Sequence, residues 1–476
     1  MYNRKRIKIY DFGGTNLKKI QTTTQPIFDA RKLGIPKMIL LGIQHLFAMF
    51  GATVLVPIIV NNFFDGALSI QVTLFFAGFG TLFFHICSKF KVPAFLGSSF
   101  TFLGGFETIS KLNSGIFATM TQAEKLPYAC GGIVVAGALY LVLALIIKLV
   151  GVKRAMRFLP PVVTGPMIIC IGLSLAPSAV NNSLTYWPLA LIAFAVVVIF
   201  TIWGKGMFRI IPILMGMLIA YIAAIIFKMT GLIGNDILSF NAVKEASYVD
   251  LPPFQLCKFN ISAILVMAPI ALATMMEHIG DISAISATTG KNFVKDPGLH
   301  RTLIGDGIAT ALAGAFGGPA NTTYGENTGV LELSKVYDPR VIRIAAYSAI
   351  ILSFIPKFAG AISTMPAAII GGISFILYGM ISAIGVRNVV ENKVDFTKSR
   401  NLIIAACILV CGLGFSKGIT FTIANTPITL TGLAIAAIVG ILLNAILPGK
   451  DYNFDDSISD NKAKAAETET SETVEA

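Results

Sequence analysis

One glycine-rich, polar stretch lies between two apolar runs and reads Gly317-Gly318-Pro319-Ala320-Asn321-Thr322-Thr323-Tyr324-Gly325-Glu326-Asn327-Thr328-Gly329. Such a stretch cannot form a helix that faces lipid, because its polar groups would meet hydrocarbon. Irregular backbone at membrane depth is tolerated where it is buried in protein or lines a cavity. If the surrounding chain is embedded in a membrane, this stretch therefore indicates a broken segment at a functional position.

The composition of the whole chain is that of a membrane protein. Of its 476 residues, 55% are hydrophobic and 13% are charged, and the mean hydropathy is +0.76. Soluble domains carry about 25% charged residues, so a water-soluble surface could not be built here. The composition excludes a secreted disulfide scaffold, a disordered protein and a typical cytosolic enzyme. The six cysteines form no CxxC pair and are expected to be packing residues.

Fourteen apolar segments are candidates for membrane spans, each judged against the length of about 20 residues that a crossing helix needs. They lie near residues 38–60, 68–87, 92–107, 129–150, 159–178, 187–203, 209–228, 260–279, 302–318, 320–334, 341–358, 366–386, 402–416 and 427–447. The third and tenth segments are too short or too polar to be ordinary helices, and the tenth contains the stretch quoted above.

The positions of the basic residues support this count. With a cytoplasmic N-terminus, 30 of the 37 Lys and Arg residues fall on the cytoplasmic side and 7 on the outer side, as the positive-inside rule requires. A wrong number of spans would distribute the basic residues more evenly between the two sides of the membrane. We therefore predict fourteen segments, a cell-membrane location and both termini in the cytoplasm. The net charge of +12 is then an orientation signal and requires no nucleic-acid partner.

The longest predicted outer connection, residues 229–259, divides the chain into two halves of seven segments. An odd number places the second half upside down relative to the first, as in many secondary transporters. The predicted fold class is therefore an all-α polytopic membrane protein of fourteen transmembrane segments in two inverted repeats. Residues 1–37 are expected to form a cytoplasmic tail, and residues 448–476 a disordered acidic one.

A few ionisable residues fall inside the predicted spans, where such groups are costly and usually functional. Glu277 and Asp281 are four residues apart and so share one helix face. Two ionised carboxylates on one face repel, so one of them should hold a proton at neutral pH, as a proton-coupled or cation-coupled site requires. In the competing interpretation, the helix ends near Glu277 and both carboxylates are solvated. His45 is either a partner of this site or a packed core histidine, and His85 is expected to be structural.

The first half contains a matching broken segment, which reads Val92-Pro93-Ala94-Phe95-Leu96-Gly97-Ser98-Ser99-Phe100-Thr101-Phe102-Leu103-Gly104-Gly105. Interrupted segments in corresponding places of two halves point to a midplane binding site. We expect each to form a short extended stretch followed by a half-helix whose N-terminus offers free N–H groups. Carboxylates, such donors and the rings of Phe100, Tyr324 and Tyr378 together suit a flat polar heterocycle. A phosphate or sulfate substrate would instead need Arg or Lys at depth, and no predicted span carries one there.

These motifs resemble the nucleobase–ascorbate transporter family, and in particular its members that carry uracil. The matching stretches are residues 44–57, 93–100, 296–301 and 321–327, within a resemblance that runs from about 38 to 448. The resemblance implies a core domain of residues 38–150 and 260–358 and a gate domain of residues 159–228 and 366–447. It also implies short antiparallel strands in segments 3 and 10, and a homodimer in which core moves against gate by alternating access.

The resemblance further implies which residues bind substrate. The two glutamates would hydrogen-bond the base, the backbone at two positions would contact it, and three side chains would line the pocket. The two glutamates are Glu277 and Glu326, and the backbone positions are Phe100 and Gly325. The three side chains that would line the pocket are those of Ala52, Tyr324 and Tyr378. Asp281, Glu277 and His45 are the candidates for proton coupling.

One departure from the family bears on the substrate. The best-known uracil-carrying group has His at the position of Asp281, whereas purine-carrying relatives often have Asp there but usually have Gln at the position of Glu326. We predict a symporter that imports uracil with a proton; a xanthine or urate permease, a dual uracil–xanthine permease and sodium coupling are the alternatives. An anion transporter is disfavoured by the lack of deep basic residues. A membrane enzyme or sensor is disfavoured because the sequence contains no metal-ligand cluster or nucleophile–base pair, so neither a cofactor nor a metal is expected.

Overall fold

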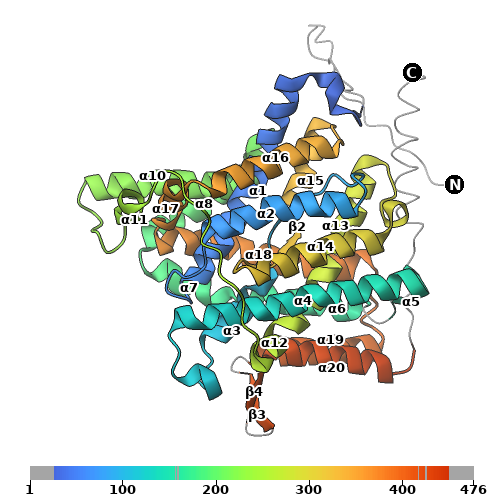
Figure 1. The fold of residues 1–476 in the computed structure, drawn as a ribbon. Helices are drawn as coiled ribbons and strands as arrows, with labels where there is room; N and C mark the ends of the chain where they lie inside the picture. Colours follow the sequence, from blue (N-terminus) through green and yellow to red (C-terminus); the bar gives the residue numbers. More distant parts are fainter. Residues whose placement is uncertain (1–25, 156, 158–159, 416–417, 424–425, 450–476) are drawn as a thin grey trace, which may run out of the picture.

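The computed structural model describes residues 26–449 apart from residues 156, 158–159, 416–417 and 424–425 (Figure 1). The predicted tails therefore lie largely outside the described residues. The helices are α1 (Ile35–Asn61), α2 (Ile70–Cys87), α3 (Leu103–Ser110), α4 (Gln122–Val150), α5 (Val152–Ala155), α6 (Pro161–Ser174), α7 (Ala176–Leu184), α8 (Trp187–Trp203), α9 (Met207–Ile210), α10 (Pro212–Met229), α11 (Asn241–Glu245), α12 (Ile261–Met267), α13 (Ala271–Thr289), α14 (Leu299–Ala315), α15 (Gly325–Ser334), α16 (Pro339–Ser353), α17 (Pro356–Ser363), α18 (Ala367–Glu391), α19 (Ser399–Gly414) and α20 (Gly432–Ile446). The strands are β1 (Leu96–Ser98), β2 (Asn321–Thr323), β3 (Ile419–Ile423) and β4 (Thr426–Leu430).

Many of these helices have the length and composition of membrane spans. Within the described residues, seven are long and apolar enough to cross a membrane, counting α6 with α7 and α12 with α13 as single helices. An eighth is obtained if α16 and α17, which meet at a bend of 86°, form one span. Helices α8, α19 and α20 are apolar but shorter. The molecule is thus a mostly helical protein with several potential membrane spans, while the arrangement as fourteen segments in inverted repeats stays a prediction.

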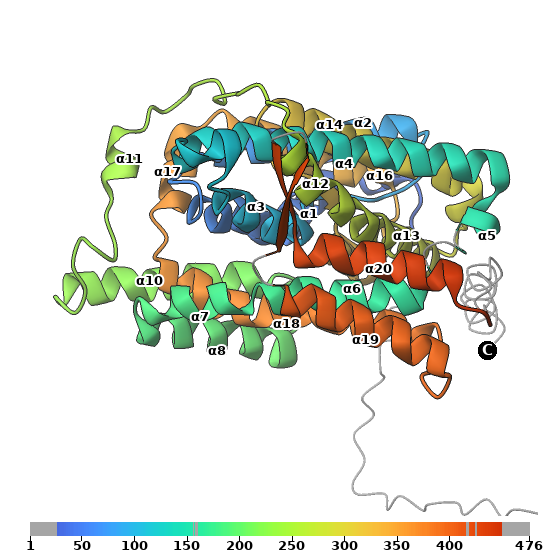
Figure 2. The same ribbon diagram turned by 90° about the horizontal axis from the view of Figure 1, so that it is seen from below.

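The helices are arranged in two layers, which Figure 2 shows edge-on. In the first layer, α4 packs against α14, α2 packs against both α14 and α16, and α1 packs against α16. In the second layer, α18 packs against α6, α7 and α8, while α19 packs against α6 and α20. The two broken segments, at β1 and β2, belong to the first layer.

Close approach of backbones holds the first layer together where α4 crosses α14. A Cβ atom added at Gly137 would lie 2.5 Å from the carbonyl oxygen of Gly307, and one added at Gly307 would lie 2.8 Å from that of Gly137. Small residues favour such contacts in membranes. Burial of apolar surface contributes little to helix association there, because the lipid tails are equally apolar. The helices therefore associate through tight van der Waals contact.

Several predicted span boundaries differ from the structure, among them the start of α4, which is Gln122 where residue 129 was predicted, the end of α13 and the start of α20. Helix α13 continues to Thr289 and ends at Gly290, which adopts the left-handed conformation common after a helix; Asp281 thus lies inside the helix and beyond the predicted end at residue 279. The predicted start of the last span at residue 427 is wrong. Strands β3 and β4 form an antiparallel hairpin there, and α20 begins at Gly432. The alternating β-branched and aromatic residues of β3 favour a strand.

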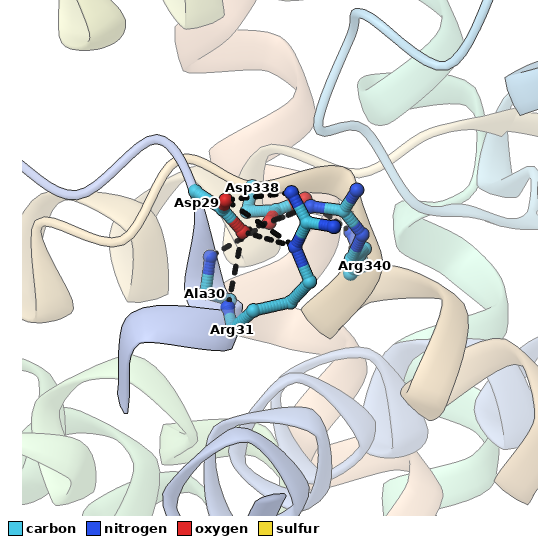
Figure 3. A network of polar contacts seen from close by, with 5 residues as sticks. All are labelled: Asp29, Ala30, Arg31, Asp338 and Arg340. Atoms are coloured by element: carbon cyan, nitrogen blue, oxygen red, sulfur yellow. Dashed lines mark hydrogen bonds and ion pairs between the residues drawn. The ribbon is translucent and has the colours of Figure 1, made fainter. Parts of the chain in front are cut away.

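A short N-terminal segment is fixed to the connection between α15 and α16 (Figure 3). The backbone of Ile27 pairs with Lys335 and Tyr337 through two bonds of 2.8 Å. The backbone N–H of Ala30 donates to Asp338 over 2.7 Å, and Arg340 donates to Asp29 over 3.1 Å.

Arg31 holds the carboxyl group of Asp29 in its ionised form. Its guanidinium donates to both carboxylate oxygens of Asp29 and lowers the pKa of that carboxyl to about 2. Asp29 is therefore ionised at neutral pH. A depressed carboxyl pKa stabilises the folded state above the unfolded pKa of about 4, and that contribution is lost only as the pH falls toward 2.

The glycine contact between α4 and α14 predicts a stability effect. Replacing glycine by alanine inside a helix normally stabilises it by about 1 kcal/mol, but at Gly137 the new methyl group would overlap a backbone carbonyl. Overpacking of this kind costs about 1–3 kcal/mol, so Gly137→Ala should lower the unfolding temperature of the detergent-purified protein. Gly379→Ala on α18, where the added Cβ meets nothing within 4 Å, is the matched control and should not. Equal behaviour of the two variants would contradict the close contact.

Candidate functional site

The two broken segments meet in a two-stranded antiparallel sheet. Leu96 is opposite Thr323, Gly97 opposite Thr322 and Ser98 opposite Asn321. Bonds from Ser99 N–H to Ala320 O (2.8 Å) and from Tyr324 N–H to Phe95 O (3.0 Å) extend the pairing at both ends. The prediction of an extended stretch followed by a short helix is confirmed in both segments, because β1 is followed by a 3₁₀ turn (Phe100–Phe102) and α3, and β2 by α15.

Tyr324 joins this sheet to α1. Its hydroxyl donates to the carbonyl of Ser98 over 2.8 Å and accepts a longer bond of 3.3 Å from Thr53. The Ser98 hydroxyl in turn donates to the backbone carbonyl of Thr53 over 2.8 Å. Gly97 is required beside this ring, since a Cβ at that position would lie 2.4 Å from the ring carbon that carries the hydroxyl. The side chain of Tyr324 is only 4% exposed, so its position is fixed by packing as well as by hydrogen bonds.

The carboxylates of α13 face the two broken segments. Thr323, the last residue of β2, donates its hydroxyl to Asp281 over 2.7 Å. Thr101, in the 3₁₀ turn after β1, donates to Glu277 over 3.3 Å. Both carboxylates are half-buried. The interpretation of Glu277 and Asp281 as solvated groups at a helix end is therefore wrong, because each lies inside α13 and has a threonine partner from a different broken segment.

Glu326 lies in the first turn of α15 and lines a small cavity of about 90 Å³. Ala52 of α1, which the resemblance assigns to the substrate pocket, lines the same cavity. The other lining residues come mainly from α1 and from the region around α9 and α10; they are Ala48, Gly51, Arg209, Ile210, Ile211, Pro212, Ile213, Leu214 and Met380. Glu326 is close enough to Glu277 and Asp281 to interact with them electrostatically. The three acidic residues therefore form one acidic cluster.

Arg209 is the functional candidate that sequence reasoning missed. It is the first residue of a predicted span and is one of the 30 basic residues predicted to lie on the cytoplasmic side. In the structure it lines the cavity of Glu326 and Ala52. Arg209 is exposed, so its position does not contradict the prediction that no predicted span carries a deep basic residue.

The remaining predicted residues occupy distinct positions. Gly325 is exposed at the start of α15, and a Cβ there would lie 4.0 Å from a carboxylate oxygen of Asp281, with no closer neighbour outside its own chain segment. Phe100 opens the 3₁₀ turn after β1 and is half-buried. Tyr378 lies on α18 in the second layer, where its buried hydroxyl accepts a 3.5 Å bond from Ser178. Among the described residues, no hydrogen bond links Tyr378 to the acidic cluster.

The buried histidines are held by fixed partners. Asn327 donates to the Nδ1 atom and to the backbone carbonyl of His45, over 3.2 and 3.0 Å, so His45 connects α1 to the first turn of α15. His85 lies 3.0 Å from the carbonyl of Ala94, in agreement with a structural role. His278 lies 3.0 Å from Asp306 of α14, and both side chains are fully buried.

Comparison with known proteins shows the family of this chain. Residues 36–421 match the sequence profile of a group described as the permease family. The chain is 38% identical over 455 residues to the uracil permease of Bacillus caldolyticus, with 92% of this chain and 99% of the relative covered. This chain belongs to the nucleobase–ascorbate transporter family. The probable uracil permease of Haemophilus influenzae is 39% identical over 421 residues, or 87% of the permease described here and 94% of the relative.

A solved structure extends the comparison to the fold. The transmembrane domain of the cyanobacterial bicarbonate transporter BicA superposes with a TM-score of 0.57, covering 82% of this permease and 98% of that domain. The sequences are 14% identical, so this likeness concerns the fold alone. The expectations of membership in this family and of a transporter are confirmed.

The hydroxyl of Tyr324 predicts a second stability effect. Tyr324→Phe leaves the carbonyl of Ser98 without that buried donor, and an unpaired buried group costs about 1–3 kcal/mol. The unfolding temperature of the purified permease should fall. Tyr347→Phe on α16, where the side chain is 53% exposed, removes a hydroxyl of the same kind at the surface and should change little. If both variants unfold like the parent, the hydroxyl bonds of Tyr324 do not stabilise the fold.

Proposed function

We propose that this permease imports uracil across the cytoplasmic membrane together with a proton. The observation that carries the proposal is the arrangement of Glu277 and Glu326 beside two broken segments, in a chain whose relatives are uracil permeases. The relatives support a nucleobase as substrate, and the acidic cluster supports coupling to a cation.

Uracil presents ring N–H donors and carbonyl acceptors, and the site offers partners for both. Glu277 and Glu326 would accept from the ring N–H groups, since charged acceptors make the stronger hydrogen bonds. The backbone N–H groups at the start of α15, where Gly325 leaves space, would donate to a ring carbonyl. Backbone at Phe100 would contribute in the same way from the other broken segment. The rings of Tyr324 and Tyr378 and the small side chain of Ala52 would then bound the space for the planar base.

Coupling to a proton is proposed for the pair on α13. Asp281 and Glu277 are one helical turn apart, and Glu326 and Asp306 add negative charge within electrostatic range. Several carboxylates in a poorly hydrated site cannot all be ionised at low cost, so binding of one proton would reduce their repulsion. His45, which joins α1 to α15 through Asn327, would transmit the state of the site to the first helix. Sodium bound by the same carboxylates is the competing coupling ion.

Transport would follow from movement of one layer against the other. In this proposal the first layer, residues 38–150 and 260–358, is the core that carries the substrate, and the second, residues 159–228 and 366–447, is the gate. The cavity of Glu326 supports this division, because α1 and α15 line it on one side and residues around α9 and α10 on the other. A homodimer in which the gates contact each other and the cores move is part of the same proposal, as is a cytoplasmic location for both termini.

The binding role predicts a specific loss of uptake. In a cell that lacks its own uracil transporters, the parent chain should accumulate labelled uracil, and Glu277→Gln or Glu326→Gln should reduce uptake at low substrate concentration by about 10- to 100-fold, the value of a charge-assisted hydrogen bond. Glu332→Gln, on the exposed face of α15, is the matched control and should retain uptake. Full uptake by Glu277→Gln at equal membrane abundance would refute its role.

The coupling role predicts a dependence on external pH. Import driven by an inward proton gradient should fall as external pH is raised from about 6 to 8, and should collapse when a protonophore is added. Replacing external sodium by choline should have no effect. Uptake that ignored the protonophore but required sodium would identify sodium as the coupling ion, and uptake that ignored both would exclude symport.

Asp281 supports one alternative substrate class, because aspartate at this position resembles the purine-carrying members of the family. A xanthine or dual-specificity permease would show competition between labelled uracil and excess unlabelled xanthine or urate. Competition by uracil alone is expected if the Tyr324-Gly325-Glu326-Asn327 match governs specificity.

A further inference from the structure

A second and larger cavity lies away from the acidic cluster, at the ends of the helices that carry it. Its volume is about 690 Å³, within the range of small-molecule sites. Four chain segments line it: the N-terminal segment, the connection from α2 to β1, the connection from α13 to α14, and the end of the α15–α16 connection with the start of α16. The lining residues are Phe28, Phe90, Lys91, Lys291, Asn292, Phe293, Lys295, Asp296, Tyr337, Asp338, Pro339, Arg340 and Arg343.

Positive charge is in excess in this cavity. Its lining contains five basic side chains and two acidic ones. The two acids already have basic partners, since Asp296 pairs with Lys91 over 2.5 Å and Asp338 with Arg340 over 2.9 Å. Arg340 also contacts Asp29 (Figure 3). Lys291 and Arg343 therefore carry positive charge that these two acids do not pair with, and a cavity lined mainly by one sign of charge concentrates ligands of the opposite sign.

Two of these cations contact aromatic rings. The ammonium of Lys291 lies 4.0 Å from the ring centre of Phe28, and the guanidinium of Arg343 lies 5.1 Å from that of Phe90. Neither cation has a carboxylate partner among the described residues. The Nη1 atom of Arg343 is buried and has no hydrogen-bond partner among the described residues. A buried donor of this kind is costly when unpaired, and an anion in the cavity would supply its acceptor.

The cavity walls also suit an organic ligand. Phe28 and Phe90 are 41% and 51% exposed, although both are large apolar side chains in an otherwise charged region. Arginine and lysine beside aromatic rings provide bidentate and point-charge recognition of phosphate together with apolar contact for the rest of a ligand. Inorganic phosphate alone would leave those rings and most of the volume unused.

We propose that this cavity binds an organic phosphate ester, with its phosphate held by Lys291 and Arg343 and its organic part against Phe28 and Phe90. The same chemistry is available from a soluble nucleotide and from the head group of an anionic phospholipid. The site does not depend on the proposed substrate. It lies directly after α13 and α15, the helices of Asp281 and Glu326, so a bound ester would connect their ends to the N-terminal segment.

The test measures binding to the full chain. Uridine monophosphate, inorganic phosphate and, in a separate arm, nanodiscs of phosphatidic acid or phosphatidylcholine would be compared by titration calorimetry and by the shift in unfolding temperature. We expect saturable binding of either uridine monophosphate or phosphatidic acid, whichever is the source of the ester. Inorganic phosphate should bind at least tenfold more weakly than the ester.

Three variants locate the binding site. Arg343→Gln and Lys291→Gln should each weaken binding by about 10- to 100-fold, while Lys291→Arg should largely restore it. Lys89→Gln removes one charge from an exposed residue of the connection that holds Phe90, outside the cavity lining, and should bind like the parent. Unliganded unfolding temperatures would show that each variant is folded. Binding of neither ester, or equal losses in Lys89→Gln and Arg343→Gln, would overturn the proposal.

Discussion

The fold of this permease depends on one constraint, which is that backbone N–H and C=O groups away from water need partners within the protein. At the broken segments no helix supplies them. The two three-residue strands satisfy each other instead, and the bonds at Ser99 and Tyr324 continue the pairing to the points where short helices begin. Because of this arrangement, helix N-termini and carboxylates can be brought together in the interior. The hydroxyls of Thr53 and Tyr324, and the absence of a side chain at Gly97, hold the sheet in place.

Much of this could be predicted because the relevant signals are local. The composition of residues 317–329 and 92–105 excludes ordinary membrane helices, and a strand followed by a half-helix is what such sequences allow. The spacing of Glu277 and Asp281 places both carboxylates on one face of α13. The position of His85 in an apolar run indicated a packed residue, and its contact with Ala94 agrees. Helix ends were less accurate where a helix continued into polar sequence, as α13 does.

What could not be predicted involves residues far apart in the chain. Nothing local in the sequence indicates that Thr101 faces Glu277 or that Thr323 faces Asp281, because these bonds depend on how the two broken segments cross α13. Arg209 is one of the basic residues that indicate orientation, and only the packed structure shows that it lines the same cavity as Glu326. The β3–β4 pair is not predicted from the sequence, because its strands are short and fall in a predicted connection and at the start of a predicted span. The attachment of residues 27–30 to the α15–α16 connection likewise depends on tertiary structure.

The pairing of β1 with β2 has a consequence for the order in which the protein is made. Ser98 and Tyr324 are 226 residues apart along the chain, so the first broken segment leaves the ribosome long before its partner exists. Until then its backbone groups must be satisfied by water or by other protein. Contacts so distant in sequence form slowly, and incomplete intermediates of this kind are prone to misassembly. The pairing of β1 with β2 therefore cannot form before residues 321–323 have been made, and the contacts around Tyr324 are incomplete until then.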